Sequence, residues 1–551
     1  QLVLLTHGAQ VAAADDPAPD IAGAAVWGLL RSAQSEHPGR FVLVDVDADE
    51  RSLPALPAAL ASGEPQLALR AGTAYAPRLA RLAAPARELA APDVDGADAV
   101  GTAAVAGTAE TDGTAETDGT VLITGGTGGL GALLARHLVA ERGARSLVLA
   151  SRAGADAPGA VELQAELNEL GAELTLAACD VSDRAQLAEL LAAIPAERPL
   201  RAVVHAAGAL EDGLLGTLTP EQLERVLAPK LDGALHLDEL TRGHDLTSFV
   251  LFSSLAGTLG TPGQANYAAA NACLDALAAR RRSLGLPGIA LAWGAWEAER
   301  GMTAGLSRLE LARTRRAGVG TLPVPTALEL YDVAPTVDRA FVVPAQLDAG
   351  ALRALAEADL LAPLLRGLVR APRRRAPQAQ NGALARSVAA ATPAARERIV
   401  LEAVRTEVAD VLGHASPETV AGGRAFNELG FDSLAAVELR NRLAAASGLE
   451  LPATAIFDYP NAAALADYLL GRLAPGAGGR GELVEEELDR LEPALLALND
   501  GAARGRVSAR LQALLGRLAG ADEPAESVAV AEQLESASDE EIFGFIDREL
   551  G

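Results

Sequence analysis

A glycine-rich turn between a strand-like and a helix-like segment constrains the fold of this chain most. Residues 121–124 are largely apolar and strand-like, residues 125–131 are Gly-Gly-Thr-Gly-Gly-Leu-Gly, and an apolar helical period runs from Leu133 to Leu138. Such a turn lets the backbone approach a pyrophosphate, whose charge a helix N-terminus stabilises. Strands and helices continue to alternate over 120–365, which predicts an α/β fold with a doubly wound parallel sheet.

Composition disfavours several classes of function. The 551 residues include 47 basic and 73 acidic ones, and the net charge of −26 argues against nucleic-acid and membrane partners. No apolar run is long enough to span a bilayer, and two cysteines, Cys179 and Cys273, suggest neither a disulfide framework nor a metal site. We therefore expect a cytoplasmic protein without a metal.

Linkers and breaks divide the chain. Residues 1–95 alternate strands with a helical stretch but lack a glycine fingerprint, and 96–119 form a low-complexity linker with Thr-Ala-Glu-Thr-Asp-Gly in tandem. A second linker spans 366–388, and 389–473 show only helical periods, which indicates a small helical bundle. An acidic helical tail covers 482–551. Because the chain starts inside a strand-like run, we expect it to be a piece of a longer polypeptide.

Residues at the ends of the predicted strands complete a dinucleotide site. Arg152 follows the second strand, where an acid would bind a ribose 2′-hydroxyl but Arg suits a 2′-phosphate, so the sequence predicts NADPH rather than NADH. Asp180 can receive the adenine amine. A purely structural glycine turn and a merely solvated Arg152 are the alternatives. The predicted contact residues are Thr124, Gly125, Thr127, Gly128, Gly129, Leu130, Gly131, Ser151, Arg152, Asp180, Val181, His205, Ala206, Ala207 and Gly208.

A second group of side chains has the chemistry for carbonyl reduction. Ser254 follows a strand, Tyr267 comes 13 residues later, and Asn271 lies one helical turn beyond Tyr267 on the same helix face. Tyrosine can protonate a ketone oxygen if a cation lowers its pKa, and a serine hydroxyl can share the oxyanion. Lys230 is the single lysine among the 47 basic residues, and unlike guanidinium its ammonium can release a proton. The alternative is a buried Tyr with a capping Ser.

These residues resemble the short-chain dehydrogenase/reductase superfamily, and most closely the ketoreductases of modular type I polyketide synthases. In those ketoreductases the superfamily's Lys and Asn are exchanged, and the Lys lies 37 positions before the Tyr, where this chain has Lys230. The resemblance implies Tyr267 as proton donor, Ser254 as oxyanion partner, and Lys230 and Asn271 as groups that tune Tyr267 and relay protons. It also implies a Rossmann-type catalytic subdomain preceded by a truncated, Rossmann-like structural subdomain without cofactor.

The loop after the fourth predicted strand bears on stereochemistry. Leu210-Glu211-Asp212 resembles the Leu-x-Asp signature of B-type ketoreductases, which set the D-hydroxyl. The A type has Trp eight residues before the Tyr, where this chain has Leu259. The resemblance implies B-type stereochemistry controlled by Leu210 and Asp212, although Asp212 could be an ordinary loop acid.

The helical segment 389–473 contains Gly430-Phe-Asp-Ser433-Leu and, further on, Ile456-Phe-Asp-Tyr-Pro460. Both resemble acyl carrier proteins, which implies 4′-phosphopantetheine on Ser433 and a phosphopantetheinyl transferase as a partner. A serine at a helix start is otherwise usually an N-cap. A helix N-terminus also favours the charge of a phosphodiester.

The tail has two heptad seams, beginning at Val484 and Val507, and residues 522–549 hold ten acids and one base. It resembles a C-terminal docking domain of a modular synthase, in which a dimerising helix pair precedes an acidic helix. The resemblance implies a homodimer, contact with upstream domains of the same synthase, and the N-terminal docking helix of the next polypeptide as partner. A disordered acidic tail is the alternative.

The sequence thus predicts NADPH-dependent reduction of a carrier-bound β-ketoacyl thioester to a β-hydroxyacyl thioester during polyketide chain extension, followed by transfer to the next polypeptide. One alternative is a carrier and docking scaffold whose ketoreductase is silent, which NADPH turnover on a model thioester would distinguish. Another is a free-standing reductase of a soluble metabolite, against which a phosphopantetheinyl mass gain on 389–473 would count.

Overall fold

The computed structural model describes residues 1–82, 119–297, 314–357, 361–369 and 382–474, apart from residues 14, 316, 415, 430, 432 and 453. The side chains of residues 393, 394, 433 and 434 are also outside the description. The predictions for the tail over 482–551, and for nearly all of both linkers, fall outside the described residues.

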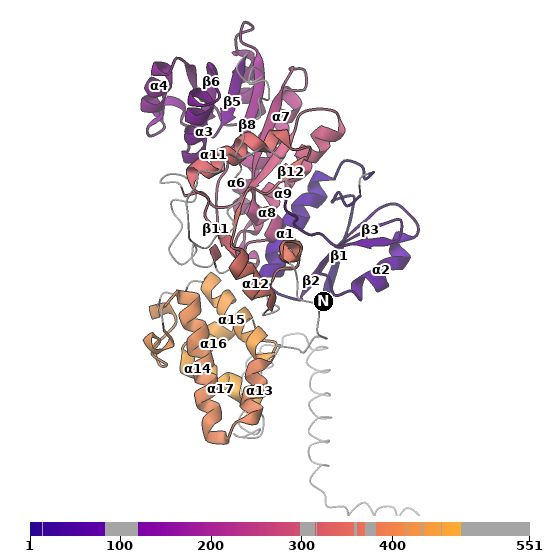
Figure 1. Cartoon of the computed structure of the whole chain (residues 1–551), viewed down its shortest axis with the longest axis vertical. Coiled ribbons are helices and arrows are strands. Elements are labelled where there is room, and N and C mark those ends of the chain that lie inside the picture. Colours follow the sequence, from indigo (N-terminus) through magenta and orange to yellow (C-terminus); the bar gives the residue numbers. More distant parts are fainter. Residues whose placement is uncertain are drawn as a thin grey trace, which may run out of the picture. The chain divides into compact units, whose positions relative to one another are not determined.

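The N-terminal half of the reductase region is a small α/β unit around one sheet (Figure 1). Strands β1 (Leu2–His7), β2 (Phe41–Val46) and β3 (Gln66–Arg70) are parallel, and β4 (Thr73–Tyr75) is antiparallel to β3. Helix α1 (Ile21–Glu36) joins β1 to β2, and α2 (Ser52–Leu60) joins β2 to β3. The alternation of strands and helix predicted for this region is confirmed.

The catalytic half is built on a parallel sheet with strand order β12-β10-β9-β8-β5-β6-β7, as predicted for a doubly wound fold. The order reverses between β5 and β8, where the crevice at the carboxyl ends of the strands is expected. The strands are β5 (Thr120–Thr124), β6 (Ser146–Ser151), β7 (Glu173–Ala178), β8 (Leu200–His205), β9 (Ser248–Ser254), β10 (Ile289–Trp293) and β12 (Phe341–Val342).

Helices on both sides of this sheet bury its apolar strands. The helices of this half are α3 (Gly129–Ala140), α4 (Ala160–Glu169), α5 (Arg184–Ala192), α6 (Pro220–Leu227), α7 (Gly233–Leu240), α8 (Leu255–Leu259), α9 (Ala265–Ser283), α11 (Val324–Val333) and α12 (Ala349–Glu357). A π-helical turn, Ala228–Asp232, separates α6 from α7, and β11 (Val319–Gly320) pairs with β13 (Gln346–Leu347).

The two halves meet where α1 packs on α9 (Figure 1). The helices approach closely because Gly28 has no side chain, and a Cβ there would overlap the carbonyl oxygen of Ala268. Because α9 carries Tyr267 and Asn271, this contact connects the N-terminal half to the candidate site.

The carrier region is a helical bundle, as predicted. Its helices are α13 (Ala383–Ala390), α14 (Pro393–Leu412), α15 (Ser433–Ser447), α16 (Ala455–Asp458) and α17 (Ala462–Leu473). Its core is aliphatic and includes Val404, Val408, Leu439, Leu443, Leu465 and Leu469.

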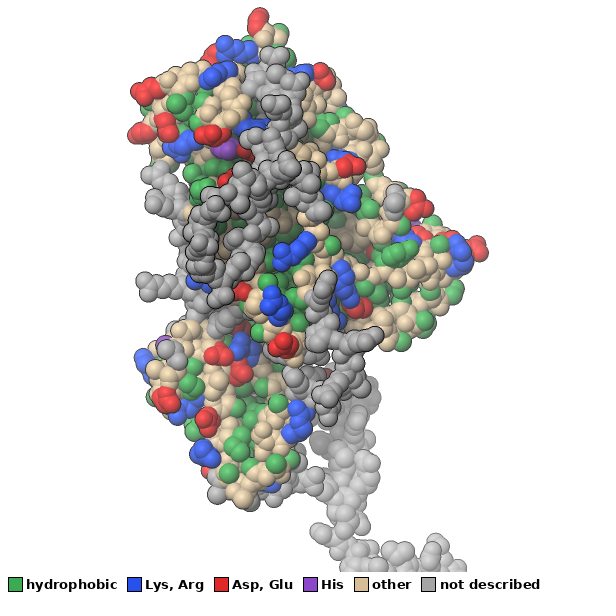
Figure 2. All heavy atoms as spheres, in the orientation of Figure 1, with side chains coloured by type: hydrophobic (Ala, Val, Ile, Leu, Met, Phe, Trp, Pro, Cys, Tyr) green, Lys and Arg blue, Asp and Glu red, His purple; other side chains and the backbone are tan. Residues whose placement is uncertain are grey.

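Surface charge is mixed in the described part of the chain. Figure 2 shows acidic and basic side chains interspersed over the face it presents. Within the described ranges, no helix combines the length and apolarity that crossing a bilayer requires.

Candidate functional site

The glycine-rich turn lines a cavity of about 470 Å³ at the carboxyl ends of the strands. Helix α3 starts from Gly128, which has no side chain to cap the helix, so the backbone N–H groups of its first turn lack a side-chain partner. A Cβ at Gly131 would overlap the carbonyl oxygen of Gly125, and Gly125 itself has a φ of +67°. The turn therefore needs glycine and leaves a cradle that fits a pyrophosphate.

Most of the predicted cofactor residues line this cavity: Gly125, Thr127, Gly128, Gly129, Leu130, Gly131, Ser151, Arg152, Asp180, Val181, Ala206, Ala207 and Gly208. The cavity is also lined by residues that the sequence did not predict, namely Ala150, Cys179, Ser182, Ala209, Arg225, Ala228 and Pro229. A glycine cradle at a helix N-terminus with an exposed Arg152 beside it is a donor set that fits a phosphorylated dinucleotide.

Thr124 and His205, which were also predicted to contact the cofactor, do not line this cavity. Both are fully buried, and the Thr124 hydroxyl lies 2.7 Å from His205 Nδ1 while His205 Nε2 lies 2.9 Å from the carbonyl oxygen of Lys230. Burial and the nearby Lys230 lower the pKa of His205 to about 4, so the ring is neutral. The Thr124–His205 pair thus contacts the π-helical turn that carries Lys230.

Lys230 is held in a buried group of polar atoms. Its side chain is 2% exposed, and Nζ donates to the Phe252 carbonyl oxygen at 2.8 Å and to Asn271 Oδ1 at 2.9 Å. The ammonium nitrogen lies 5.2 Å from the ring centroid of Tyr267. Burial lowers the pKa of Lys230 to about 7, and the carboxylate of Asp275 opposes that shift.

Tyr267 and Ser254 adjoin this group. Ser254 ends β9 and accepts from the Ala256 N–H at 3.2 Å, while the Asn271 amide donates to the Tyr267 carbonyl oxygen at 2.7 Å. Burial raises the pKa of Tyr267, and hydrogen bonds with Asn271 and Ser254 oppose the increase. The phenol is therefore protonated at neutral pH and can act as a donor. The structure brings Tyr267, Ser254, Lys230 and Asn271 together.

Asp275 is a member of this cluster that the sequence analysis missed. It lies one turn beyond Asn271 on α9, and its Oδ1 is buried without a hydrogen-bond partner. Burial raises the pKa of Asp275 to about 7, while Ser253, Arg31 and Lys230 oppose the shift. The helical spacing of residues 267, 271 and 275 was the only available signal in the sequence.

The Leu210–Asp212 segment lies against the start of α9. Gln264 Nε2 donates to both Asp212 carboxylate oxygens at 3.3 and 3.2 Å, and Asn266 donates to the Glu211 carbonyl oxygen at 2.8 Å. The Asp212 charge contributes to the raised pKa of Tyr267. A loop carboxylate thus lies close enough to Tyr267 to influence it.

Ser433 begins helix α15, so the predicted attachment residue lies at a helix N-terminus. The neighbouring Phe431 ring lies 5.1 Å from that of Phe426, and Ile456 of the second carrier motif is 3% exposed. The contact between the Phe426 and Phe431 rings anchors the chain just before Ser433.

Four family models match successive parts of the chain. The KR domain matches residues 119–298, and the Rossmann fold domain of the polyketide synthase extender module SpnB matches 1–79. The phosphopantetheine attachment site matches 402–469, and the erythronolide synthase docking domain matches 477–536.

Among curated proteins, the chain is 52% identical over 86% of its length to the spectinabilin polyketide synthase system protein NorA′ of Streptomyces orinoci. It is 46% identical over its whole length to the polyketide synthase GfsB of Streptomyces halstedii. The chain spans only 12% and 10% of these relatives.

Solved structures match the reductase region. PlmKR1, a ketoreductase from the first module of phoslactomycin biosynthesis in Streptomyces sp. HK803, is 41% identical with a TM-score of 0.57, covering 67% of this chain and 81% of that chain. An A1-type ketoreductase is 40% identical with a TM-score of 0.57, covering 66% and 73%.

Proposed function

The chain belongs to the modular polyketide synthases and carries their ketoreductase, and from that premise we propose that it reduces a β-ketoacyl thioester held on Ser433. Membership implies NADPH as the reductant and a covalent phosphopantetheine on the carrier region. The proposed product is the D-configured β-hydroxyacyl thioester, which then passes to another polypeptide.

The observation that carries this proposal is the position of Lys230 between the cavity and Tyr267. The Lys230 stem passes Gly208, which lines the cavity, so closely that a Cβ at Gly208 would lie 2.9 Å from Lys230 Cε. Its ammonium contacts Asn271 and lies near the Tyr267 ring. Tyr267 and Lys230 do not line the cavity themselves but adjoin it behind Gly208. We propose that a ketone held beside Gly208 reaches the Tyr267 phenol as proton donor, with the Lys230 ammonium as the nearby cation.

The chemistry assigned to the side chains is proton donation and charge stabilisation. NADPH, when bound, supplies a hydride to the β-carbon of the ketone. As the carbonyl π bond breaks, Tyr267 donates its phenolic proton to the developing oxyanion, which the Ser254 hydroxyl shares. The phenolate that remains is stabilised by the Lys230 ammonium and regains a proton through the Lys230–Asn271 pair.

We assign B-type stereochemistry from local residues. The Leu210-Glu211-Asp212 motif and its contact with Gln264 support this assignment, as does Leu259 where the A type has Trp. The 40% identity to an A1-type structure is an overall value and does not by itself discriminate between the types.

The carrier and tail complete the proposal. A phosphopantetheine arm on Ser433 tethers the substrate, and tethering raises its effective concentration at the reductase to about millimolar. The docking-domain match supports contact with another synthase polypeptide. We propose in addition a homodimer, contact with upstream domains of the same synthase, the next polypeptide's N-terminal docking helix as partner, and a cytoplasmic location.

Incubation of the full chain with NADPH and a soluble β-ketoacyl thioester tests the proposal. We expect NADPH consumption, and chiral chromatography should give the D-hydroxyl product. An L-hydroxyl product would refute the assignment to Asp212 and leave the reductase intact. Cofactor binding without reduction would favour a silent ketoreductase.

A further inference from the structure

One face of helix α1, in the N-terminal half, contacts the segment that separates Ser254 from Tyr267. That segment contains α8, a connecting turn and the start of α9. Three side chains from the last two turns of α1 hydrogen-bond to its backbone, namely Arg31, Ser35 and Glu36. These hydrogen bonds therefore link the N-terminal half to the segment that sets the distance between Ser254 and Tyr267.

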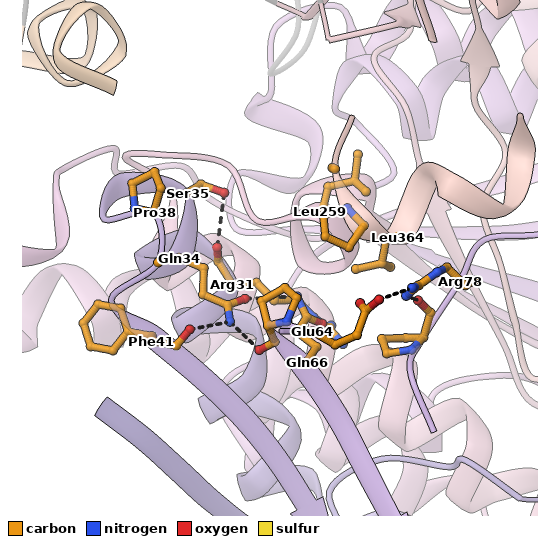
Figure 3. A pocket seen from close by; sticks show the side chains of 15 residues that line it. Arg31, Gln34, Ser35, Pro38, Phe41, Glu64, Gln66, Arg78, Leu259 and Leu364 are labelled. Atoms are coloured by element: carbon orange, nitrogen blue, oxygen red, sulfur yellow. Dashed lines mark hydrogen bonds and ion pairs between the residues drawn. The ribbon is translucent and has the colours of Figure 1, made fainter. Parts of the chain in front are cut away.

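Arg31 and Ser35 fix the turn between α8 and α9. Arg31 Nη1 donates to the Gly257 carbonyl oxygen at 2.9 Å, and Ser35 Oγ donates to the Gly260 carbonyl oxygen at 2.8 Å. Gly260 has a φ of +77°, and a Cβ there would overlap the Arg31 carbonyl group. Figure 3 shows Arg31 and Ser35 beside a cavity of about 250 Å³ that Leu259 also lines. The turn therefore lies directly on α1.

Glu36 joins two loops of the catalytic half. Its Oε1 accepts from the Gly263 N–H and its Oε2 from the Leu215 N–H, both at 3.0 Å, and the residue is 2% exposed. Leu215 follows the Leu210–Asp212 segment, and Gly213 N–H donates to the Gly263 carbonyl oxygen at 2.8 Å. One carboxylate thus binds both sides of the contact between the Asp212 loop and α9.

We propose that Glu36 is a positioning residue of the ketoreductase, holding the Asp212 loop and the start of α9 in the register that sets Tyr267 against one face of the ketone. The inference rests on the proposed function. Hydrogen bonds to a buried carboxylate are stronger than neutral ones, so the two together resist separation of the loops. Small displacements of a proton donor have large kinetic consequences.

The test compares Glu36→Gln with wild type in the full chain. Glutamine preserves the shape but turns an NH₂ group toward one of the two N–H donors, so one hydrogen bond is lost and two donors face each other. With NADPH and a soluble β-ketoacyl thioester, we expect kcat to fall by about tenfold to a hundredfold. The minor hydroxyl configuration should rise, while NADPH affinity, measured by fluorescence, stays within about twofold because Glu36 does not line the cofactor cavity.

Glu50→Gln, an exposed glutamate of the same half, is the matched control and should behave as wild type. An unchanged kcat and product configuration in Glu36→Gln would overturn the inference. A loss of activity that tracks the fraction of chain still binding NADPH is the signature of unfolding, and in that case Glu36→Asp decides. Its shorter side chain keeps the charge but cannot reach both the Leu215 and Gly263 N–H groups, so we expect kcat to fall about threefold, and an unchanged kcat would overturn the inference. Wild-type activity independently reports on the proposed function.

Discussion

The two halves of the reductase region share an architecture but differ where a cofactor would lie. In the catalytic half, the helix after the first strand starts from Gly128 and leaves a cavity. In the N-terminal half, the equivalent helix starts from Asp20, whose carboxylate accepts from the Gly23 N–H at 2.7 Å and so occupies the helix N-terminus. The helix N-terminus is thus free to bind an anion in the catalytic half, whereas in the N-terminal half the Asp20 carboxylate already occupies it.

The crevice of the N-terminal half is filled as well. Arg70, at the end of β3, pairs with Asp45 at 2.7 Å and with Asp16 at 2.9 Å, and Asp45 is fully buried. Asp45 also accepts from the Ala9 N–H at 2.8 Å. A buried ion group therefore occupies the region where the catalytic half holds a cavity, and the N-terminal half contributes instead through α1.

The largest expected difference between the two halves is the effect on kcat of removing a tyrosine hydroxyl. Tyr267→Phe removes the proposed proton donor without removing the ring, so kcat should fall by about 10²–10⁴-fold. Tyr75→Phe changes an exposed tyrosine of the N-terminal half and should leave kcat unchanged. Steady-state NADPH oxidation checks both variants. A wild-type rate of NADPH oxidation in Tyr267→Phe would show that Tyr267 is not the proton donor and that neither tyrosine matters for reduction.

The second effect concerns stability. Arg70→Met leaves the buried Asp45 without its partner, and breaking such a pair costs about 3–5 kcal/mol in the free energy of unfolding. Arg51→Met breaks a solvent-screened pair with Asp49 and should lower the free energy of unfolding far less. Urea unfolding measures the difference. Equal costs would mean that the Arg70 group does not hold the N-terminal half together.

A third prediction concerns an acid placed at the start of α3, as Asp20 is at the start of α1. Gly128→Asp places a carboxylate at the N-terminus of α3, where it competes with a pyrophosphate, so NADPH affinity should fall by about tenfold. Gly128→Asn controls for size and should weaken binding less. Asp20→Asn, in the other half, should leave the affinity unchanged. Isothermal titration calorimetry measures all three, and undiminished affinity in Gly128→Asp would contradict the cradle.

The smallest effect is a shift in pH dependence. Burial lowers the pKa of Lys230 to about 7, so activity that needs its ammonium should decline as the pH rises through about 7. The Asp275 charge raises that pKa, so Asp275→Asn should move the decline to lower pH. Asp245→Asn, an exposed control, should not move it. A profile of kcat/KM against pH measures the direction of the shift. A decline that moves to higher pH in Asp275→Asn would show that Asp275 does not raise the pKa of Lys230.

The sequence was informative where chemistry and spacing are local. The glycine turn, the strand alternation and the one-turn spacing of Tyr267 and Asn271 each depend on neighbouring residues, and the structure has the elements they predict. Thr124 and His205 were placed at the cofactor because they end strands beside the turn. Their side chains bond to each other, and His205 also contacts the Lys230 carbonyl oxygen, which strand ends alone could not predict because a terminal strand residue can face either side of the sheet.

Other residues of the candidate site and its surroundings could not be predicted from local sequence patterns. Arg31 and Glu36 act on α8 and α9 from more than two hundred positions earlier in the chain, and only the packing of α1 on α9 brings them there. Asp275 has the spacing of a helix face, but its effect depends on burial beside Lys230, which spacing does not reveal.

Deuterium transfer from NADPH shows whether the chain reduces a β-ketone and whether Lys230 is needed for that step. The full chain is incubated with NADPH carrying deuterium at the transferable position and a soluble β-ketoacyl thioester, and the product is examined by mass spectrometry. We expect one deuterium at the β-carbon of the hydroxyacyl product, and the loss of this transfer when Lys230 is replaced by methionine. Product formation without deuterium, or undiminished transfer in Lys230→Met, would be inconsistent with hydride reduction assisted by Lys230.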